Sequence, residues 1–203
     1  MMSETTREPL SVHRLLPGLL GDRATFGLDD RSLDRVIGWH LAGADAARPT
    51  AVSGSWYEGA TEPKSEFPSG FPCAPMLSRR LVGLLGEGLA ASGDLLPVDT
   101  GDPEDVGDGA YSLLLVTEVV DCLDARRSSA PRRATGEIKK AVFRPEAVPT
   151  GLAAFRVPQY PEGVYWNGWA ADLLTARLGD DLEDRLCWSE DPTRTPHPDP
   201  WAF

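Results

Sequence analysis

The amino-acid sequence predicts a single α+β domain in which a mixed or antiparallel central sheet is flanked by a few helices. Three observations predict this class: a dense apolar run from Tyr111 to Asp124 rich in β-branched residues, leucine-rich stretches with helical spacing, and strand-like and helical segments that follow one another without a repeated βαβ order. A domain of 203 residues buries about 70% of its unfolded surface. It therefore needs neither disulfides nor a structural metal.

Three segments are predicted. Residues 1–47 form an N-terminal helical segment packed on the core, residues 48–190 form the α+β core, and residues 191–203 form a Pro-rich, extended tail. In the tail, Trp201 and Phe203 are possible anchors.

The N-terminal segment begins with nine polar residues that we expect to be loose. The apolar piece from Leu10 to Leu20 contains Pro and Gly, so it should dock on the core without forming a long helix. Beyond Ser32, the spacing of four apolar residues predicts a short amphipathic helix that ends at Gly43. These residues are Leu33, Val36, Ile37 and Leu41.

The run from Tyr111 to Asp124 is the centre of the predicted core. Its β-branched residues favour a strand, although the spacing of several apolar residues also fits a helix. We predict a strand. Because the run is longer than most strands, and because Glu118 interrupts it with a charge, a bulge or bend is expected near Glu118.

The remaining elements follow from caps and apolar spacing. Ser78 is the predicted N-cap of a leucine-rich helix that Gly93 ends, and Asn167 is a second N-cap candidate. Each cap is followed, six and seven residues later, by a pair of leucines, which is a shared way of starting a helix. Four more strands are expected at Leu95 to Val98, Ile138 to Phe143, Ala153 to Val157 and Leu182 to Trp188, the last with Leu186 and Trp188 facing inward.

The formal charge of −11 defines an acidic protein and argues against binding to nucleic acid or to an anionic membrane. A basic partner fits better. Between Arg126 and Arg144, however, the sequence contains seven basic residues and only one acidic residue, Glu137. The net charge of this stretch is therefore +6, and that of the rest of the chain is −17. A solvated basic hairpin is the ordinary interpretation of that stretch; nucleic-acid binding through it is a third functional alternative.

Cysteine usage and hydropathy indicate a cytoplasmic protein. Cys73, Cys122 and Cys187 are odd in number and far apart, so neither a disulfide framework nor a zinc site is indicated. The N-terminus lacks the pattern of a signal peptide, and no stretch approaches the length of a membrane span.

The search for catalytic patterns yields no catalytic residue, metal site or cofactor. There is no Gly-x-Ser-x-Gly or Walker-type sequence, and the three histidines are isolated. The acidic turn from Asp99 to Gly109 departs from a calcium loop, since Gly101 and Pro103 stand where oxygen ligands belong. Asp121 and Asp124 either accept backbone N–H bonds at the end of the apolar run or converge as an acid–base pair.

The loop from Arg48 to Pro75 is rich in Pro, Gly and Ser but contains four aromatic residues. Such aromatics are either pinned to the core or offered to a partner, and pinning is the commoner outcome. The residues are Trp56, Tyr57, Phe67 and Phe71.

Between residues 67 and 188 the chain resembles a family of immunity proteins from bacterial polymorphic toxin systems, long described only as a domain of unknown function. The resemblance rests on the Pro72 to Leu81 segment with its Ser-led helix, and on Tyr111 to Asp124, which matches Tyr-x-Leu-Leu-x-Val-x-x-Val-Val-Asp-x-x-Asp. It continues through Ser128, the Val142-Phe143 and Phe155-Arg156-Val157-Pro158 segments, and the helix after Asn167. The resemblance implies neutralisation of a toxin by binding, without catalysis.

Our first functional hypothesis is therefore a cytoplasmic immunity protein that occludes one cognate toxin with a basic surface. The second is an enzyme or accessory protein that acts on a small molecule or peptide in a biosynthetic pathway, with Asp121, Asp124 and nearby arginines lining a pocket. For partner binding the candidate residues are aromatic anchors and the two aspartates. They are Trp56, Tyr57, Asp121, Asp124, Tyr165, Trp166 and Trp169.

Overall fold

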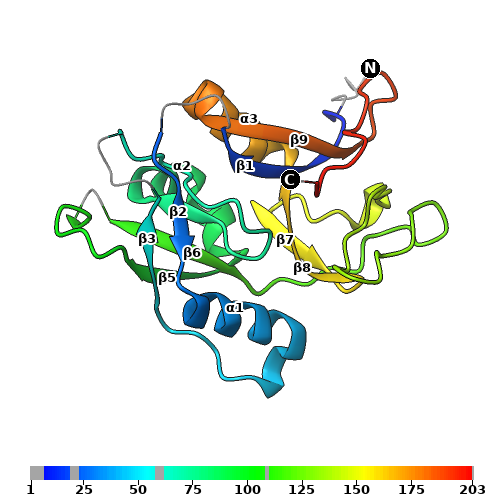
Figure 1. Cartoon of the computed structure of the whole chain (residues 1–203). Helices are drawn as coiled ribbons and strands as arrows, with labels where there is room; N and C mark the ends of the chain where they lie inside the picture. Colours follow the sequence, from blue (N-terminus) through cyan, green and yellow to red (C-terminus); the bar gives the residue numbers. More distant parts are fainter. Residues whose placement is uncertain (1–6, 19–22, 58–61, 108–109, 203) are drawn as a thin grey trace.

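A computed structural model describes residues 7–18, 23–57, 62–107 and 110–202. Within them, strands are divided between two sheets, and three α-helices cover these sheets (Figure 1). The predicted α+β class is confirmed, with two sheets in place of one central sheet. The helices are α1 (Asp30–Ala42), α2 (Arg79–Ala90) and α3 (Gly168–Leu178).

The first sheet is antiparallel, with strand order β7-β8-β1-β9. The segment predicted only to dock on the core is the inner strand β1. The N-terminal segment is therefore not merely helical, because it also supplies β1 and β2. The strands of this sheet are β1 (Ser11–Pro17), β7 (Ala154–Val157), β8 (Tyr160–Asn167) and β9 (Leu182–Ser189).

The second sheet is mixed, with strand order β2-β3-β5-β6-β4 and one parallel pair, β3 with β5. Its inner strand β6, between β5 and β4, is the first half of the apolar run on which the fold prediction rested. The strands are β2 (Phe26–Leu28), β3 (Val52–Trp56), β4 (Met76–Ser78), β5 (Gly93–Asp99) and β6 (Tyr111–Val116).

The apolar run bends where the bend was expected. β6 ends at Val116, and the N–H groups of Thr117 and Glu118 both donate to the carbonyl of Ser92. Beyond this point the chain crosses to the first sheet, where the N–H of Val120 donates to the carbonyl of Arg156 on β7. One stretch of sequence thus connects the two sheets.

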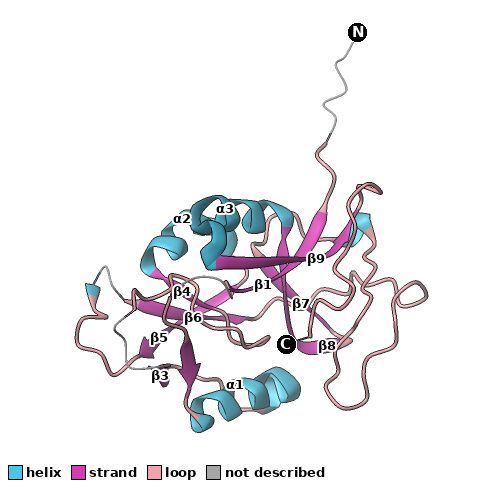
Figure 2. Cartoon of the chain, turned by 45° about the horizontal axis from the view of Figure 1, so that its top comes forward, coloured by secondary structure: helices cyan, strands magenta, loops and turns pink. Residues whose placement is uncertain are grey.

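Helices α2 and α3 lie together on one side of the molecule, and α1 lies on the other (Figures 1 and 2). Leucines of α2 and α3 form one core cluster with residues of β6 and β8, so the helix pair covers the region where the two sheets meet. The N-caps of α1 and α2 are Asp29, whose side chain accepts from the Ser32 N–H, and Ser78, whose side chain accepts from the Leu81 N–H. Gly43 ends α1 as predicted.

The C-terminal end of α2 differs from the prediction. The helix ends at Ala90, and Gly93 is instead the first residue of β5. Gly86 interrupts the helix with a positive φ of 52°, a conformation that favours glycine because it has no Cβ.

The prediction of a strand over residues 138–143 is wrong. Backbone N–H groups of this segment donate to serine hydroxyls in place of the backbone of a neighbouring strand. Ser128 Oγ accepts from the Val142 N–H, and Ser129 Oγ accepts from the Lys140 N–H. Alternation also fails, because the neighbours Val142 and Phe143 are both buried. Only an isolated bridge joins Phe143 to Leu123.

The strands predicted around residues 95–98, 153–157 and 182–188 are confirmed as β5, β7 and β9. Trp201 anchors the tail: it is buried, with ring centres 4.8 Å from Tyr160 and 5.2 Å from Tyr165. Residues 1–6 and Phe203 lie outside the described residues. In the portions that are described, no helix has both the length and the apolar character required to cross a bilayer.

Candidate functional site

The aromatic residues predicted as anchors have different fates. Tyr165 and Trp166 are buried in β8, so neither side chain is available to a partner. Trp56 is pinned, since its ring packs edge-on against Phe26 and Tyr111 and its Nε1 donates to Asp105 Oδ2 at 3.0 Å. The remaining two candidates, Tyr57 and Trp169, are exposed.

The two aspartates at the end of the apolar run do not form an acid–base pair in a pocket. Asp124 Oδ1 accepts from the N–H groups of Arg126 and Arg127 at 3.0 and 3.3 Å, which confirms the backbone-capping interpretation for this residue. Asp121 has an exposed side chain, and its Oδ2 lies 3.6 Å from Arg144 Nη2. Neither aspartate lines the pocket described next.

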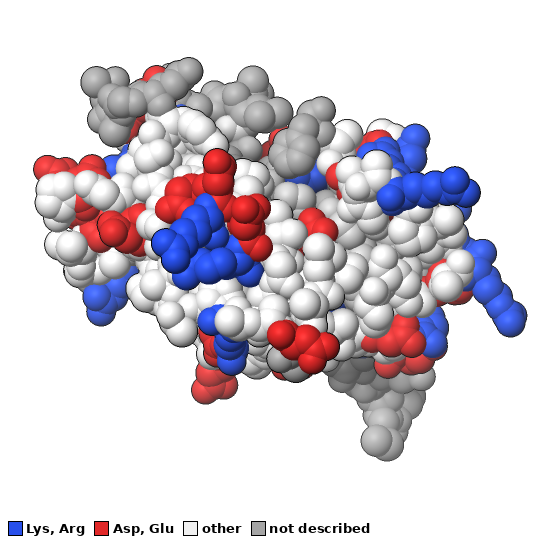
Figure 3. All heavy atoms as spheres, turned by 60° about the horizontal axis from the view of Figure 1, so that its bottom comes forward, with Lys and Arg blue, Asp and Glu red and all other residues white. Residues whose placement is uncertain are grey.

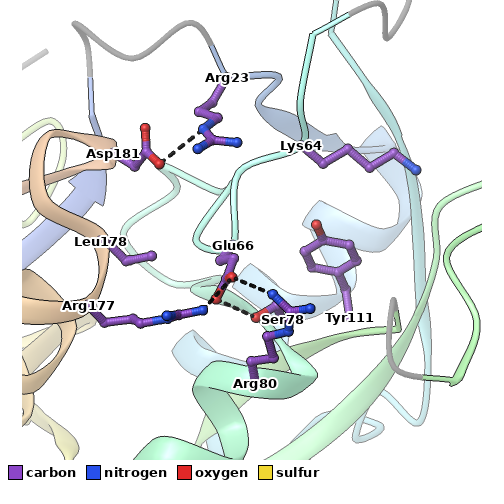
Figure 4. Close-up of a pocket in the computed structure, with 9 residues that line it drawn as sticks. All are labelled: Arg23, Lys64, Glu66, Ser78, Arg80, Tyr111, Arg177, Leu178 and Asp181. Carbon is purple, nitrogen blue, oxygen red and sulfur yellow. Dashed lines mark hydrogen bonds and ion pairs between the residues drawn. The ribbon is translucent and has the colours of Figure 1, made fainter.

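That pocket, of about 530 Å³, opens between the start of α2, the end of α3 and the loop before Phe67 (Figure 4). Glu66 is its central carboxylate. Arg177 Nη2 and Arg80 Nη1 lie 3.4 and 3.6 Å from Glu66 Oε1, and Ser78 Oγ donates to Oε2 at 3.3 Å. Glu66 thus joins the N-cap of α2 to the last turn of α3.

The other charged groups of the pocket are also paired. Arg23 Nε lies 3.0 Å from Asp181 Oδ2, and Lys64 Nζ lies 2.8 and 2.6 Å from carboxylate oxygens of Asp102 and Asp105. Burial alone lowers the pKa of Lys64. The hydrogen bonds that Lys64 donates to the carboxylates of Asp102 and Asp105 outweigh this effect, so the pKa is raised. Lys64 is therefore an ammonium ion, not a nucleophilic amine.

The pocket lacks the features of an acid–base centre. Burial raises the pKa of Tyr111 well above its usual range, and its hydroxyl donates to the carbonyl of Ser65 at 3.1 Å. Among the residues with described positions, no group of three or more His, Cys, Asp or Glu side chains is placed to hold a metal ion. The arrangement suits exchange of ion pairs with a charged partner.

Cys73, Cys122 and Cys187 are buried and form no disulfide. Burial raises the pKa of Cys73 and of Cys122 to about 12, so both are thiols near neutral pH.

Helices α2 and α3 run antiparallel. The first turn of α2 and the last turn of α3 share Glu66, as described above, whereas Gly88 near the end of α2 lies against Trp169 in the first turn of α3. A methyl group at Gly88 would come within 2.7 Å of the Trp169 indole, so only glycine allows this close approach.

An exposed apolar surface covers this helix pair. Leu84 and Leu173 are each 41% exposed and Trp169 is 36% exposed. Leu173 lies one turn after Trp169 on α3, and Leu84 lies on α2 just before the break at Gly86, so the three side chains are exposed on the same helix pair. We call Leu84, Gly88, Trp169 and Leu173 the α2–α3 patch.

The paired leucines noticed in the sequence explain this patch. In each helix the leucine seven residues after the cap points inward: Leu85 is 3% exposed and Leu174 is fully buried. The leucine six residues after the cap, Leu84 or Leu173, points to solvent. Periodicity could not distinguish them, because adjacent leucines at the edge of an apolar stripe are both compatible with burial.

The patch has acidic residues beside it. Glu87 and Asp172 are exposed on the same two helices, each next to a patch residue in the sequence. Arg80 and Arg177 lie on the same two helices, each one turn from a patch leucine, and both are exposed. Acidic and basic groups are likewise interspersed on the face that carries α1 (Figure 3). The α2–α3 patch therefore combines apolar area with neighbouring charges of both signs.

Comparison with known proteins does not identify a family. No protein-family model matches this chain, and no curated protein matches its sequence significantly.

Proposed function

We propose that this protein is a cytoplasmic bacterial immunity protein that binds a cognate toxin domain and neutralises it by occlusion, without catalysis. The observation that carries the proposal is the α2–α3 patch, in which Leu84, Trp169 and Leu173 are exposed together. Large apolar side chains gathered on one surface are typical of protein interfaces, and tryptophan is prominent among residues that dominate binding energy.

Charge supports a basic partner. The chain carries −11 overall, and Glu87 and Asp172 lie beside the patch. The charges of the two arginines beside the patch are paired with Glu66. Complementary charge accelerates association with a basic toxin surface, while the buried apolar side chains slow dissociation. Asp121 is exposed as well, but it lies in the stretch that crosses to β7, so it belongs to a different surface.

The test begins with affinity capture from the source cells, comparing the wild-type protein with the double variant Leu84→Ser, Leu173→Ser. We expect one basic polypeptide to be recovered in comparable amount by the wild type and lost by the double variant. The matched control is Leu41→Ser, which changes a leucine that is 59% exposed on α1 and should retain the partner. Equal recovery by all three proteins would exclude the patch as the binding surface.

The second stage tests neutralisation. The recovered polypeptide is expressed in a heterologous bacterium, where we expect it to arrest growth and co-expression of the wild-type protein to restore growth. The double variant should fail to restore growth. Trp169→Ala should raise the dissociation constant about 30-fold, the equivalent of one aromatic anchor. A captured partner that is harmless when expressed alone would contradict the immunity function.

The alternative is action on a small molecule, and the pocket around Glu66 is the observation that favours it. A protein of that kind should bind a small charged ligand at this pocket, with Glu66→Gln weakening the binding. The proposed pocket residues then differ from Asp121 and Asp124, since these lie elsewhere.

A further inference from the structure

Three polar residues of the first sheet form a continuous hydrogen-bonded chain. Ser11 Oγ lies 2.9 Å from His13 Nε2, and His13 Nδ1 lies 2.6 Å from Asp184 Oδ1. Ser11 and His13 are two positions apart on β1, so both side chains point to the same side of the sheet. β9 brings in Asp184 by pairing it with Leu15, the next residue of β1 on that side.

The order of these contacts has a chemical consequence. A carboxylate at Nδ1 favours the tautomer that carries its proton there, which leaves Nε2 free to accept the Ser11 hydroxyl proton. His13 is fully buried, and the Asp184 side chain is about one-quarter exposed, so the imidazole is held in one orientation. A hydroxyl, a base and an orienting carboxylate are thus arranged as an activated nucleophile requires.

Ser11 also has an opening. Although only 5% exposed, it lines a cavity of about 140 Å³ together with residues at the start of α3. Gly168 packs closely against this hydroxyl: a methyl group at Gly168 would lie 2.2 Å from Ser11 Oγ, so only glycine fits beside it. The cavity has room for about five water molecules.

The start of α3 supports a developing negative charge beside Ser11. The side chain of Asn167 does not cap the helix; instead its Nδ2 donates to the carbonyls of Pro149 and Leu152. The N–H groups of the first turn therefore lack this side-chain acceptor, and they point toward the end of the helix that lines the cavity. Such donors stabilise an oxyanion.

We propose that Ser11 is a nucleophile, activated by His13 and oriented through Asp184, that accepts a short acyl group from an ester. The Ser11 Oγ–acyl bond forms as the ester C–O bond breaks, and the Ser11 proton passes through His13 Nε2 to the departing alcohol. Water then attacks the acyl carbon and gives a proton to Nε2. The Ser11 Oγ–acyl bond breaks as the acid leaves, and Ser11 Oγ takes the proton back from Nε2. Ester and water become acid and alcohol, with no change of oxidation state.

None of the three side chains belongs to the α2–α3 patch, although Trp169 of that patch also lines the cavity beside Ser11. The esterase activity is tested on the protein alone, so its outcome is distinguishable from that of toxin binding. The small cavity limits the acyl group to a short chain, while the alcohol remains outside. No sequence pattern indicated this site, because Asp184 lies 171 positions from His13 and Ser11 is not in a Gly-x-Ser-x-Gly turn.

The test treats the full-length protein with p-nitrophenyl acetate and, separately, with diisopropyl fluorophosphate. We expect a stoichiometric burst of p-nitrophenol and a single adduct that peptide mass spectrometry assigns to Ser11. Ser11→Ala should lose both. Ser55→Ala, which removes an exposed hydroxyl on β3 of the second sheet, should retain both.

Two further variants separate activation from packing. His13→Gln should lower the acylation rate by about 100-fold or more, the usual contribution of a general base. Asp184→Asn should lower the maximal acylation rate with an unchanged half-saturating ester concentration, and Asp184→Glu should restore part of that rate. Thermal melts verify that each variant is folded.

The wild-type result decides the matter even if a variant fails to fold. Absence of any adduct on the wild-type protein would overturn the proposal, as would an adduct mapped to another residue. An adduct at Ser11 that forms equally fast in a folded His13→Gln protein would overturn the assignment of the base.

Discussion

The guanidinium of Arg156 lies 5.3 Å from the ring centre of Trp39, which connects β7 of the first sheet to α1 beside the second sheet. Arg156 Nε donates to the carbonyl of Val116 at 2.8 Å, where β6 ends, and Nη1 donates to the carbonyl of Pro161 at 2.9 Å. One buried side chain thus holds the end of β6, the start of β8 and helix α1 in contact.

Replacing Arg156 by Met should destabilise the protein by about 2 to 4 kcal/mol, because the carbonyls of Val116 and Pro161 lose their donor in a buried site. Loss of the buried charge offsets part of this cost, since burial also lowers the pKa of Arg156. Urea unfolding measures the change. Arg177→Met, at an exposed arginine, is the control and should change little. Equal stability of the Arg156→Met and wild-type proteins would refute this linking role.

His40 should make folding sensitive to acid. Burial, and then the charge of Arg156, lower the pKa of His40 from 6.5 to about 3, and neither ring nitrogen has a hydrogen-bond partner among the described residues. Between these two pH values the unfolded chain binds a proton that the folded protein does not. Stability from this residue is therefore complete above about pH 6.5 and falls by about 1.4 kcal/mol per pH unit as the pH decreases.

The matching variant is His40→Leu, which cannot take up this proton. We expect the difference in free energy of unfolding between wild type and variant to shift in favour of the variant from pH 7 to pH 4. Urea unfolding at each pH measures it. Parallel pH profiles for the two proteins would show that His40 titrates alike in the folded and unfolded states.

Local signals in the sequence were sufficient for much of the fold. A cap such as Ser78 acts on its own helix, and the bend near Glu118 follows from a charge within one apolar run, so each could be predicted from neighbouring residues. The strand predicted at Val142 and Phe143 failed because Ser128, 14 residues earlier, takes over the backbone N–H of Val142. Such a contact does not change the spacing of apolar residues in the sequence, so periodicity cannot reveal it.

The candidate sites were harder to predict for the same reason. Glu66 meets Arg177 across 111 positions, and no spacing rule relates them. Of the aromatic candidates, Trp169 is 36% exposed on α3, and its role in binding stays a prediction. Tyr165 and Trp166 had the same composition signal but lie on a strand buried on both faces, a fact that only the pairing of β8 with β1 and β7 reveals.

Adjacent leucines of α2 should respond differently to truncation. Leu85 is buried in the core cluster, so Leu85→Ala should cost about 2 to 5 kcal/mol. Leu84→Ala should change stability by about 0.5 kcal/mol or less, since its side chain is already partly in solvent. Thermal and urea unfolding measure both. A large loss for Leu84→Ala would mean that this residue supports the fold, and its use as a binding-surface probe would no longer be valid.

Two glycines should respond to alanine in opposite directions. Gly83 is exposed within α2, and a methyl group there meets no described atom within 4 Å beyond the helix's own backbone, so Gly83→Ala should stabilise the protein by up to about 1 kcal/mol through helix propensity. At Gly93 the methyl group would lie 2.2 Å from the carbonyl oxygen of Leu115 and 2.8 Å from the N of Thr117.

Both of these atoms belong to the backbone of the neighbouring chain segment, so they cannot move aside without opening the pairing of β5 with β6. Gly93→Ala should therefore destabilise the protein by about 2 kcal/mol or more. Differential scanning calorimetry of the two variants against the wild type measures both effects. A melting temperature for Gly93→Ala at or above the wild-type value would contradict so close an approach. It would mean that the first residue of β5 lies farther from β6 than in this fold.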